Sequence, residues 1–245
     1  MKILVCIKQG LDKEEISRFD EFALEEALGL KDKFLEAGLT DIRVDVITAG
    51  PTKATAVIKR AFGMGADRGI HIVPRDAGYS PAFVTASNLA AVAGNNSYDL
   101  ILTGIMSQDM MEGQTGPMLA ELLGLPCVTA VVKNIFNDNT GIMQVEREME
   151  NGLRDCLEIC LPALLTIQAG INTPRYPSLS NMLAAGKKQI ITLAEKDLFP
   201  APVKAKELLV SVEYPEKTRA GQLIEGPLSD QVSQFKAFLR EKDLK

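Results

Sequence analysis

A short segment near the middle of the chain combines residue types that bind phosphate groups. The segment from Gly104 to Thr115 reads GIMSQDMMEGQT and is followed by Gly116. Gly113 and Gly116 permit a close approach of the backbone to a ligand, because they carry no Cβ atom. Gln114 and Thr115 add a side-chain amide and a hydroxyl, both of which donate hydrogen bonds to phosphate oxygens. These residue types indicate a loop that can hold the phosphate of a nucleotide.

The helix expected directly after this loop favours the same interpretation. Residues 116–124, GPMLAELLG, have the apolar pattern of an amphipathic helix. Backbone N–H groups and the helix dipole make a helix N-terminus favourable for an anion. Asp109 is placed to cap the turn or to meet a ribose hydroxyl. The alternative is an ordinary strand-to-helix turn with Pro117 near the first helical position, and the residues alone leave both interpretations open.

The sequence offers no recognisable catalytic arrangement. His71 is the only histidine and lies in the apolar run GIHIV, which argues against Ser/His/Asp and Cys/His sites. The motifs G-x-S-x-G, G-x-G-x-x-G and G-x-x-x-x-G-K-[ST] are absent. Glu25 and Glu26 are expected on the solvent side of a helix. We therefore expect no catalytic residues in this chain.

The cysteines do not have the spacing of a metal site. The four cysteines are Cys6, Cys127, Cys156 and Cys160, and none belongs to a C-x-x-C pair. This spacing argues against zinc and iron–sulfur sites. Cys156 and Cys160 share a face if DCLEIC is a strand, because four residues make two strand periods. We expect buried, reduced thiols and no metal ligands.

Composition and charge exclude several classes of protein. The chain has 245 residues, of which 46% are hydrophobic and 24% charged, and its net charge of -5 gives no basic surface for nucleic acid. Trp is absent and aromatic residues make up only 5%, so base-stacking platforms are not expected. No apolar stretch approaches the roughly 20 residues of a membrane helix. The N-terminal run MKILVCIKQG is too short for a secretory signal, which predicts a cytoplasmic protein.

The first half of the chain alternates between expected strands and helices. The expected strands are 2–8, 43–50, 68–74 and 99–104, and the expected helices are 17–38, 51–66, 80–94 and 116–124. This alternation predicts an α/β, Rossmann-like, doubly wound and mainly parallel sheet. In such sheets, ligands bind at the carboxyl ends of strands near the reversal of strand order. The candidate edges are Cys6 to Leu11, Thr48 to Thr52, and Gly104 to Thr115.

The second half has a different pattern. Residues 141–168 alternate at period two, with Asn151-Gly152 as the expected hairpin turn, and predict antiparallel strands that extend the sheet. An ordered loop and a short helix are expected after Gln168. Residues 196–228 show little periodicity, and LSDQVSQFKAFLREKDLK predicts an amphipathic helix. We expect an α/β nucleotide-binding domain over 1–195 and a C-terminal arm over 196–245 that packs on a partner subunit.

Several stretches together resemble one family, the β-subunits of electron transfer flavoproteins. In chain order they are KILVCIKQ, FDEFALEEAL, VITAGP, RAFGMGADRGIHI, DLILTG, QTGPMLAELLG, VEREMENGL, LPALLTIQAGIN and PRYPSLSNMLAAGKK. The resemblance spans nearly the whole chain, and PRYPSLSNM is its most specific part. It implies a heterodimer with an α-subunit whose mobile domain carries the redox-active FAD. It also implies an AMP without redox work in this subunit, which would have no reaction of its own.

The resemblance also assigns candidate cofactor-binding residues. Phe19 matches an aromatic residue near the FAD ring of the α-subunit, although it also fits the start of the apolar stripe of the first helix. The matched positions fall on the same strand edges that the expected topology selects. The cofactor-binding candidates are Cys6, Ser17, Arg18, Phe19, Asp20, Ala49, Gly104, Asp109, Gly113, Gln114, Thr115 and Gly116.

Three further residues are candidates for partner binding by the same resemblance. Glu146 matches an acidic residue that contacts the mobile flavin domain, and the alternative is an ordinary exposed strand carboxylate. Leu179 matches the leucine of the recognition loop that inserts into a donor dehydrogenase, and the alternative is a leucine folded back on its own subunit. Tyr176 lies in the same loop, between prolines that pre-order it.

Two other functions stay open. The first is a flavin-bifurcating β-subunit, with a second FAD in place of AMP and NADH as electron donor. Bifurcating relatives tend to have a glycine-rich A-G-A-D-T-like stretch after the third strand, of which this chain shares only Ala77-Gly78. The second is a stand-alone nucleotide-binding α/β protein of the stress-protein type. The PRYPSLSNM segment and the C-terminal arm argue against it.

Overall fold

The computed structural model describes residues 1–10, 15–76, 78–137, 140–213, 221 and 223–241. The strands are β1 (Lys2–Cys6), β2 (Arg43–Ala49), β3 (Arg68–Val73), β4 (Leu100–Gly104), β5 (Cys127–Asn137), β6 (Ile142–Glu148), β7 (Arg154–Cys160), β8 (Ala163–Ile167) and β9 (Ile190–Ala194). The α-helices are α1 (Arg18–Glu36), α2 (Thr55–Met64), α3 (Ala82–Ala93), α4 (Thr115–Leu123), α5 (Leu179–Ala185), α6 (Glu195–Leu198) and α7 (Leu228–Glu241). Two 3-10 helices, η1 (Thr52–Ala54) and η2 (Glu150–Gly152), complete the described elements.

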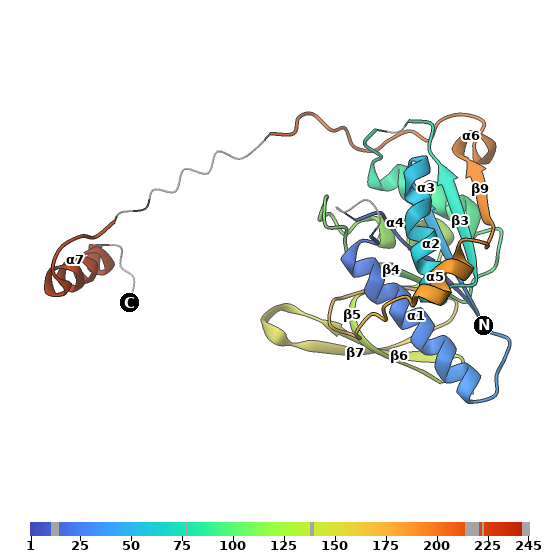
Figure 1. Ribbon diagram of the computed structural model, residues 1–245, viewed down its shortest axis with the longest axis horizontal. Coiled ribbons are helices and arrows are strands. Elements are labelled where there is room, and N and C mark those ends of the chain that lie inside the picture. The colour runs from blue at the N-terminus through green and yellow to red at the C-terminus, as the bar shows by residue number, and fades with distance from the viewer. Residues whose placement is uncertain (11–14, 77, 138–139, 214–220, 222, 242–245) are drawn as a thin grey trace. The chain divides into compact units, whose positions relative to one another are not determined.

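All described strands form one sheet in the order β7-β6-β5-β8-β4-β1-β2-β3-β9 (Figure 1). The strands from β5 through β8, β4, β1, β2 and β3 to β9 are parallel, and β6 and β7 add an antiparallel extension. The chain runs outward from β1 to β2 and β3, then returns to place β4 on the other side of β1. The predicted fold class is confirmed, and the reversal of strand order lies between β1 and β4.

The structure corrects two details of the predicted sheet. We expected residues 141–168 to be antiparallel throughout, but β8 lies parallel between β4 and β5. Its residues ALLTI are all buried, which is the pattern of a strand covered on both faces. The strand β9 was not expected, and it pairs with β3 at the sheet edge. The predicted hairpin at Asn151-Gly152 is confirmed between β6 and β7.

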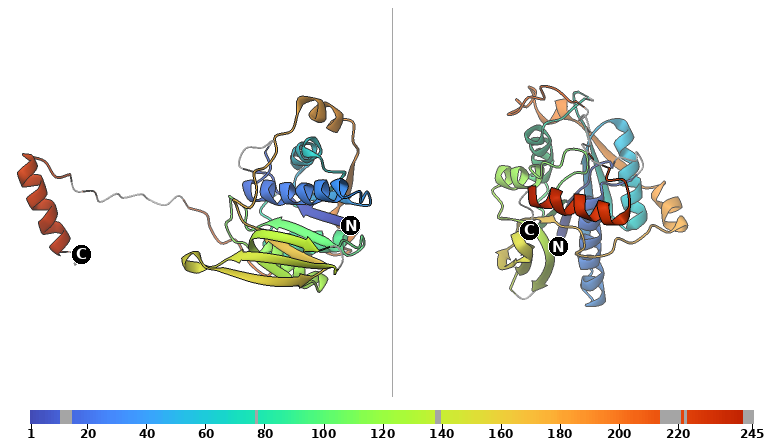
Figure 2. Two further views of the ribbon diagram at one scale, coloured as in Figure 1. Left: turned by 90° about the horizontal axis from the view of Figure 1, so that it is seen from below. Right: turned by 90° about the vertical axis from the view of Figure 1, so that its left-hand side faces the viewer.

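Helices cover both faces of the sheet. In the right-hand view of Figure 2, α1 and α2 lie on one side and α3 and α4 on the other. The buried residues form one apolar cluster under each layer, which includes Leu24 of α1 on the first side and Leu89 of α3 on the second. Burial of this much apolar surface is the main stabilising contribution to such a fold. The same packing of the helices on the sheet places the helix ends near the carboxyl ends of the strands.

Two predictions about exposure are wrong. Cys6 is buried, but Cys127, Cys156 and Cys160 are exposed, because β7 is an edge strand and Cys127 begins β5. Glu25 and Glu26 are not on a freely solvated face, because a loop from the second half of the chain packs over α1 and binds their carboxylates. Sequence periodicity does not register such a distant contact.

The predicted boundary between the two parts of the chain differs from the structure. The compact first unit runs from Met1 to Leu208, and the second unit comprises Leu209–Lys245. Residues beyond 195 contact the first unit: the Phe199 carbonyl oxygen accepts a hydrogen bond from the Arg75 guanidinium at 2.6 Å. Glu207 accepts a second one, at 2.7 Å, from the Ala82 N–H at the start of α3. Within the part of the chain that the structure describes, no helix is both long and apolar enough to cross a bilayer.

Close packing of α2 on β3 gives a test of the fold. A Cβ atom at Gly69 of β3 would overlap the Ile58 side chain and lie 2.7 Å from Phe62 Cζ. We expect Gly69→Ala to lower the free energy of unfolding by about 1–3 kcal/mol through overpacking, measured by urea denaturation followed by circular dichroism. The control Gly29→Ala meets no atom within 4 Å and is expected to raise stability by about 0.5–1 kcal/mol. Equal stability of Gly69→Ala and wild type would contradict this packing.

Candidate functional site

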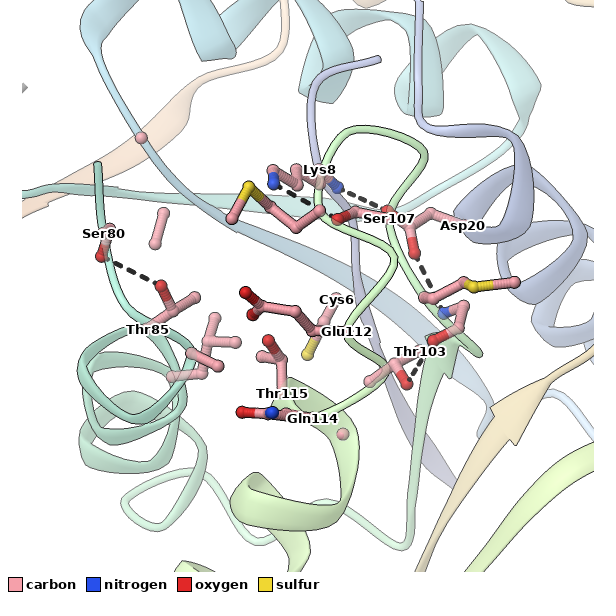
Figure 3. A pocket seen from close by; sticks show the side chains of 18 of the residues that line it. Cys6, Lys8, Asp20, Ser80, Thr85, Thr103, Ser107, Glu112, Gln114 and Thr115 are labelled. Atoms are coloured by element: carbon pink, nitrogen blue, oxygen red, sulfur yellow. Dashed lines mark hydrogen bonds between the residues drawn. The ribbon is translucent and has the colours of Figure 1, made fainter. Parts of the chain in front are cut away.

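The three predicted strand edges meet at one cavity of about 300 Å³. Figure 3 shows it at the carboxyl ends of the strands, between α3 and the loop that leads into α4. Of the predicted residues, those that line it are Cys6, Asp20, Ala49, Gly104, Asp109, Gly113, Gln114, Thr115 and Gly116. The volume lies at the lower end of the range of about 300–1,000 Å³ that is typical of small-molecule sites.

One carboxylate, that of Asp20, connects the start of α1 to the ends of β1 and β4. Asp20 accepts hydrogen bonds from the Lys8 N–H at 2.8 Å and from the Gly104 N–H at 3.0 Å. A Cβ atom at Gly104 would lie 2.5 Å from Asp20 Oδ1 and 2.7 Å from Phe19 Cβ, so this approach requires glycine. Burial raises the pKa of Asp20 to about 7, although the two N–H groups stabilise its charged form. The carboxylate thus bridges the ends of β1 and β4 across the reversal of strand order.

The other predicted residues at the start of α1 do not line the cavity. Ser17 is the N-cap residue, but its buried Oγ makes no capping hydrogen bond with the helix. Arg18 is exposed and Phe19 is half-buried beside Gly104. Residues 11–14, in the short segment before this helix, lie outside the described residues. Asp20 is therefore the one member of the predicted set 17–20 that lies on the cavity wall.

The phosphate-binding features expected of the loop before α4 lie on the cavity wall. The first turn of α4 has no side-chain cap, so its N–H groups are available to an anion. A Cβ atom at Gly116 would lie 2.7 Å from Thr166 Cγ2 and 2.8 Å from Thr103 Oγ1, so glycine lets α4 start close to the sheet. Gly113 has a φ of +65°, a left-handed conformation that favours glycine.

Lys8 lines the cavity and lies within the predicted edge Cys6 to Leu11, but it was not among the predicted site residues. Its Nζ lies 2.8 Å from both carboxylate oxygens of Asp109 and 3.4 Å from Ser107 Oγ. Partial burial of Asp109 opposes ionisation, but hydrogen bonds from Lys8 and Ser107 outweigh it and lower the pKa of Asp109. Among the described residues of the wall, Lys8 is the only cation. The signal for it was its place at the end of the first strand, two residues after Cys6.

The cavity also extends to elements that were not among the predicted edges. The loop after β3 contributes Pro74 and Gly78 to Ser80, and α3 contributes Ala82, Thr85, Asn88 and Leu89. The predicted cavity edges were only those of the first, second and fourth strands. The end of β3 lies at the same sheet edge, so the rule for parallel sheets applied to it as well. In the described part of the chain, no three His, Cys, Asp or Glu side chains gather to hold a metal ion.

The partner-binding candidates lie away from the cavity. Glu146 on β6 accepts hydrogen bonds from Lys133 at 2.6 Å and Arg154 at 3.1 Å, which lower its pKa. Leu179 begins α5 and is 78% exposed, and Tyr176 is 85% exposed. The structure therefore leaves both apolar side chains accessible and gives Glu146 two partners within its own chain.

The loop that carries Leu179 is anchored to α1. The Arg175 guanidinium donates to Glu25 at 2.9 Å and to Asp32 at 2.8 Å, and the Arg175 N–H also donates to Glu25. Asn172 donates to Glu26 at 2.9 Å, three residues before Arg175. These bonds fix the base of the loop, so that exposure of Leu179 results from an ordered backbone.

The raised pKa of Asp20 predicts a pH dependence of stability. Because its pKa is about 7 in the folded chain and 3.8 ordinarily, the folded state binds a proton between these values that the unfolded state has lost. The free energy of unfolding of wild type relative to Asp20→Asn should therefore fall as pH rises from 4 to 7, by up to about 4 kcal/mol, and then level off. Denaturation at a series of pH values measures it, and a difference independent of pH would contradict the assignment.

The chain is similar over most of its length to one family of known proteins. Residues 3–198 match the family model described as the electron transfer flavoprotein domain. The chain is 32% identical to the electron transfer flavoprotein subunit beta of Methylophilus methylotrophus, over 98% of each chain. It is 31% identical to the subunit of that name from Bacillus subtilis, over 99% of this chain and 98% of the other. The Homo sapiens subunit is 34% identical, over 92% of this chain and 93% of the other.

Proposed function

This chain belongs to the electron transfer flavoprotein family as a β-subunit, and on that premise we propose that its cavity binds AMP while a partner α-subunit holds the redox-active FAD. The heterodimer accepts electrons from a dehydrogenase and passes them to another oxidoreductase. The β-subunit has no reaction of its own in this proposal, and its AMP supports the structure. A cytoplasmic location remains a prediction.

The observation that carries the AMP proposal is the uncapped N-terminus of α4 at the wall of a cavity of about 300 Å³. The phosphate would bind to the N–H groups of Thr115 and Gly116, where the helix dipole favours negative charge. Lys8 supplies the positive charge at this wall, and Asp109 holds its Nζ in place at 2.8 Å. Glu112, whose side chain is drawn in the cavity in Figure 3, offers acceptors for ribose hydroxyl groups.

The sequence after the third strand favours AMP over a second FAD, because this chain shares only Ala77-Gly78 with the glycine-rich stretch of bifurcating relatives. The bifurcating alternative therefore remains second. The stand-alone alternative of the stress-protein type is set aside, because the chain belongs to a family of subunits.

Release of nucleotides from the purified heterodimer tests the proposal. Denaturation followed by chromatography is expected to give one FAD and one AMP per heterodimer. Absence of AMP would refute the proposal, and two FAD per heterodimer with reduction of flavin by NADH would establish the bifurcating alternative.

A change of charge at the cavity tests the phosphate position. We expect Lys8→Gln to weaken AMP binding by about 10- to 100-fold, because a hydrogen bond to a charged group contributes about 1.5–3 kcal/mol. The matched control Lys59→Gln removes the same charge from an exposed position of α2 and should leave AMP content unchanged. If both variants lost AMP equally, the phosphate would not bind beside Lys8.

We also propose that the loop around Leu179 and Tyr176 binds the donor dehydrogenase. An exposed leucine on an anchored loop is suited to insert into a partner pocket, because little conformational entropy is lost. Leu179→Ala should slow electron transfer from the donor dehydrogenase while FAD content stays unchanged, measured by steady-state flavin reduction. Leu39→Ala, a half-exposed leucine after α1, serves as the control. Equal transfer rates for Leu179→Ala and wild type would remove Leu179 from the partner site.

The C-terminal arm is proposed to pack on the α-subunit. All residues of α7 are described, and none of them is buried. Val232, Phe235 and Phe238 are 44%, 51% and 40% exposed, so the described residues of the second unit do not by themselves cover one apolar side of this helix. We also propose that Glu146 on β6 contacts the mobile flavin domain of the α-subunit. Within this chain, Glu146 forms ion pairs with Lys133 and Arg154.

A further inference from the structure

One guanidinium group of α2 contacts the exposed tyrosine of the loop before α5. The Cζ atom of Arg60 lies 5.6 Å from the centroid of the Tyr176 ring. This distance is within the limit of about 6 Å for a cation–π interaction. Tyr176 is nevertheless highly exposed, so the contact leaves most of the ring accessible to a partner.

Arg60 is itself held in place by α1. Its Nε and Nη2 atoms donate hydrogen bonds to Glu21 Oε1 at 3.1 and 3.0 Å. The side chains of Arg60 and Glu21 are only 20% and 21% exposed, so solvent screens this ion pair less than it screens a fully exposed one. Two bonds to one acceptor keep the planar guanidinium in one orientation, and its charge is compensated within the chain.

The backbone around Tyr176 is already fixed by other contacts. The residues before it are hydrogen-bonded to α1. A Cβ atom at Gly63 of α2 would overlap Met182 Sδ and lie 3.0 Å from Pro177 Cβ, so the residues after Tyr176 pack closely on α2 (Figure 1). What remains free at this position is the rotation of the Tyr176 side chain, and the contact with Arg60 restricts that rotation.

Restriction of the Tyr176 side chain before binding favours contact with a partner. An exposed side chain that becomes immobile at an interface loses rotamer entropy, and this loss weakens the complex. Aromatic side chains that fill a pocket of the partner contribute a large share of the binding energy. Leu179 follows three residues later and is also exposed, so one partner can contact both side chains.

We propose that Arg60 is a positioning residue for the donor dehydrogenase, and that it holds the Tyr176 ring in the orientation that the donor contacts. The donor surface that fits is an apolar pocket, which receives the accessible face and edge of the ring. Because Glu21 compensates the charge of Arg60, a donor that covers this region does not bury an unpaired cation. The inference rests on the donor site proposed above and adds a residue of α2 to it.

Steady-state kinetics with the complete heterodimer test the inference. The donor dehydrogenase is assayed at a series of concentrations of the heterodimer, which serves as its electron acceptor. Arg60→Gln should raise the KM for the heterodimer by about 3- to 10-fold and leave kcat within about twofold of wild type. The reason is that an ordered side chain contributes to association and not to electron transfer within the complex. A KM equal to that of wild type would overturn the inference.

The same substitution in a Tyr176→Leu background separates positioning of the ring from other effects. Tyr176→Leu alone should raise KM, and Arg60→Gln should then add less than about twofold, because the ring on which Arg60 acts is missing. A rise of about 3- to 10-fold in both backgrounds would show that Arg60 acts on the fold or contacts the donor directly. That result, or an unchanged KM for Tyr176→Leu alone, would overturn the inference.

A matched control tests whether the charge alone matters. Lys59→Gln removes a positive charge from the preceding position of α2, which is exposed, and should leave KM unchanged. If Lys59→Gln raised KM as much as Arg60→Gln, the positive charge of α2 and not the contact with Tyr176 would explain the effect, and the inference would fail.

The variant Leu179→Ala distinguishes this inference from the proposed donor site. If neither Leu179→Ala nor Arg60→Gln changes electron transfer from the donor, the donor site and the role of Arg60 both fail. If Leu179→Ala slows transfer but Arg60→Gln has the KM of wild type, the donor site stands and this inference alone fails.

Discussion

The buried carboxylate of Asp20 connects the parts of this chain that the cavity requires. It joins the start of α1 to the ends of β1 and β4, the two strands between which the strand order reverses. A gap opens at this reversal because the connections from the two strands leave to opposite faces of the sheet. The carboxylate closes the gap on one side with two backbone hydrogen bonds. The cavity can then form on the other side, between α3 and α4.

The position of Asp20 between the ends of β1 and β4 explains why residue 104 must be glycine and why the pKa of Asp20 is raised. Gly104 has no space for a Cβ atom because Asp20 and Phe19 lie against it. Burial stabilises the neutral form of Asp20, while the N–H groups of Lys8 and Gly104 stabilise the charged form. The Lys8 backbone thus binds Asp20, and its side chain binds Asp109 on the cavity wall. Lys8 therefore contacts both the carboxylate that positions the start of α1 and the carboxylate on the cavity wall.

The surface for the donor partner depends on α1 as well. Glu25 and Glu26 on α1 bind Arg175 and Asn172, which fix the loop before Leu179. The apolar faces of α1 pack on the sheet, while its carboxylates hold a loop that is about 150 residues away in the chain. The helix therefore supports both sites, and the two proposed functions of the subunit rely on one element.

The sequence by itself determined the α/β class, the parallel sheet, the hairpin at Asn151-Gly152 and the three strand edges that line the cavity. These features follow from local patterns: the period of apolar residues, the turn residues, and the order of elements along the chain. The individual candidate residues, such as Cys6 and Ala49, came from the family resemblance, and they fall on edges that the topology also selects because parallel strands place their carboxyl ends at one edge of the sheet. Whether they bind AMP stays a prediction.

Only the tertiary structure decided which side chains are paired across long distances in the chain. It placed β8 between β4 and β5, added β9 beside β3, exposed three cysteines and gave Glu25 and Glu26 their partners. It also brought Lys8 to Asp109 and left Asn88 without a donor among the described residues. No local pattern encodes these outcomes, because burial and pairing depend on which distant segment packs against each residue.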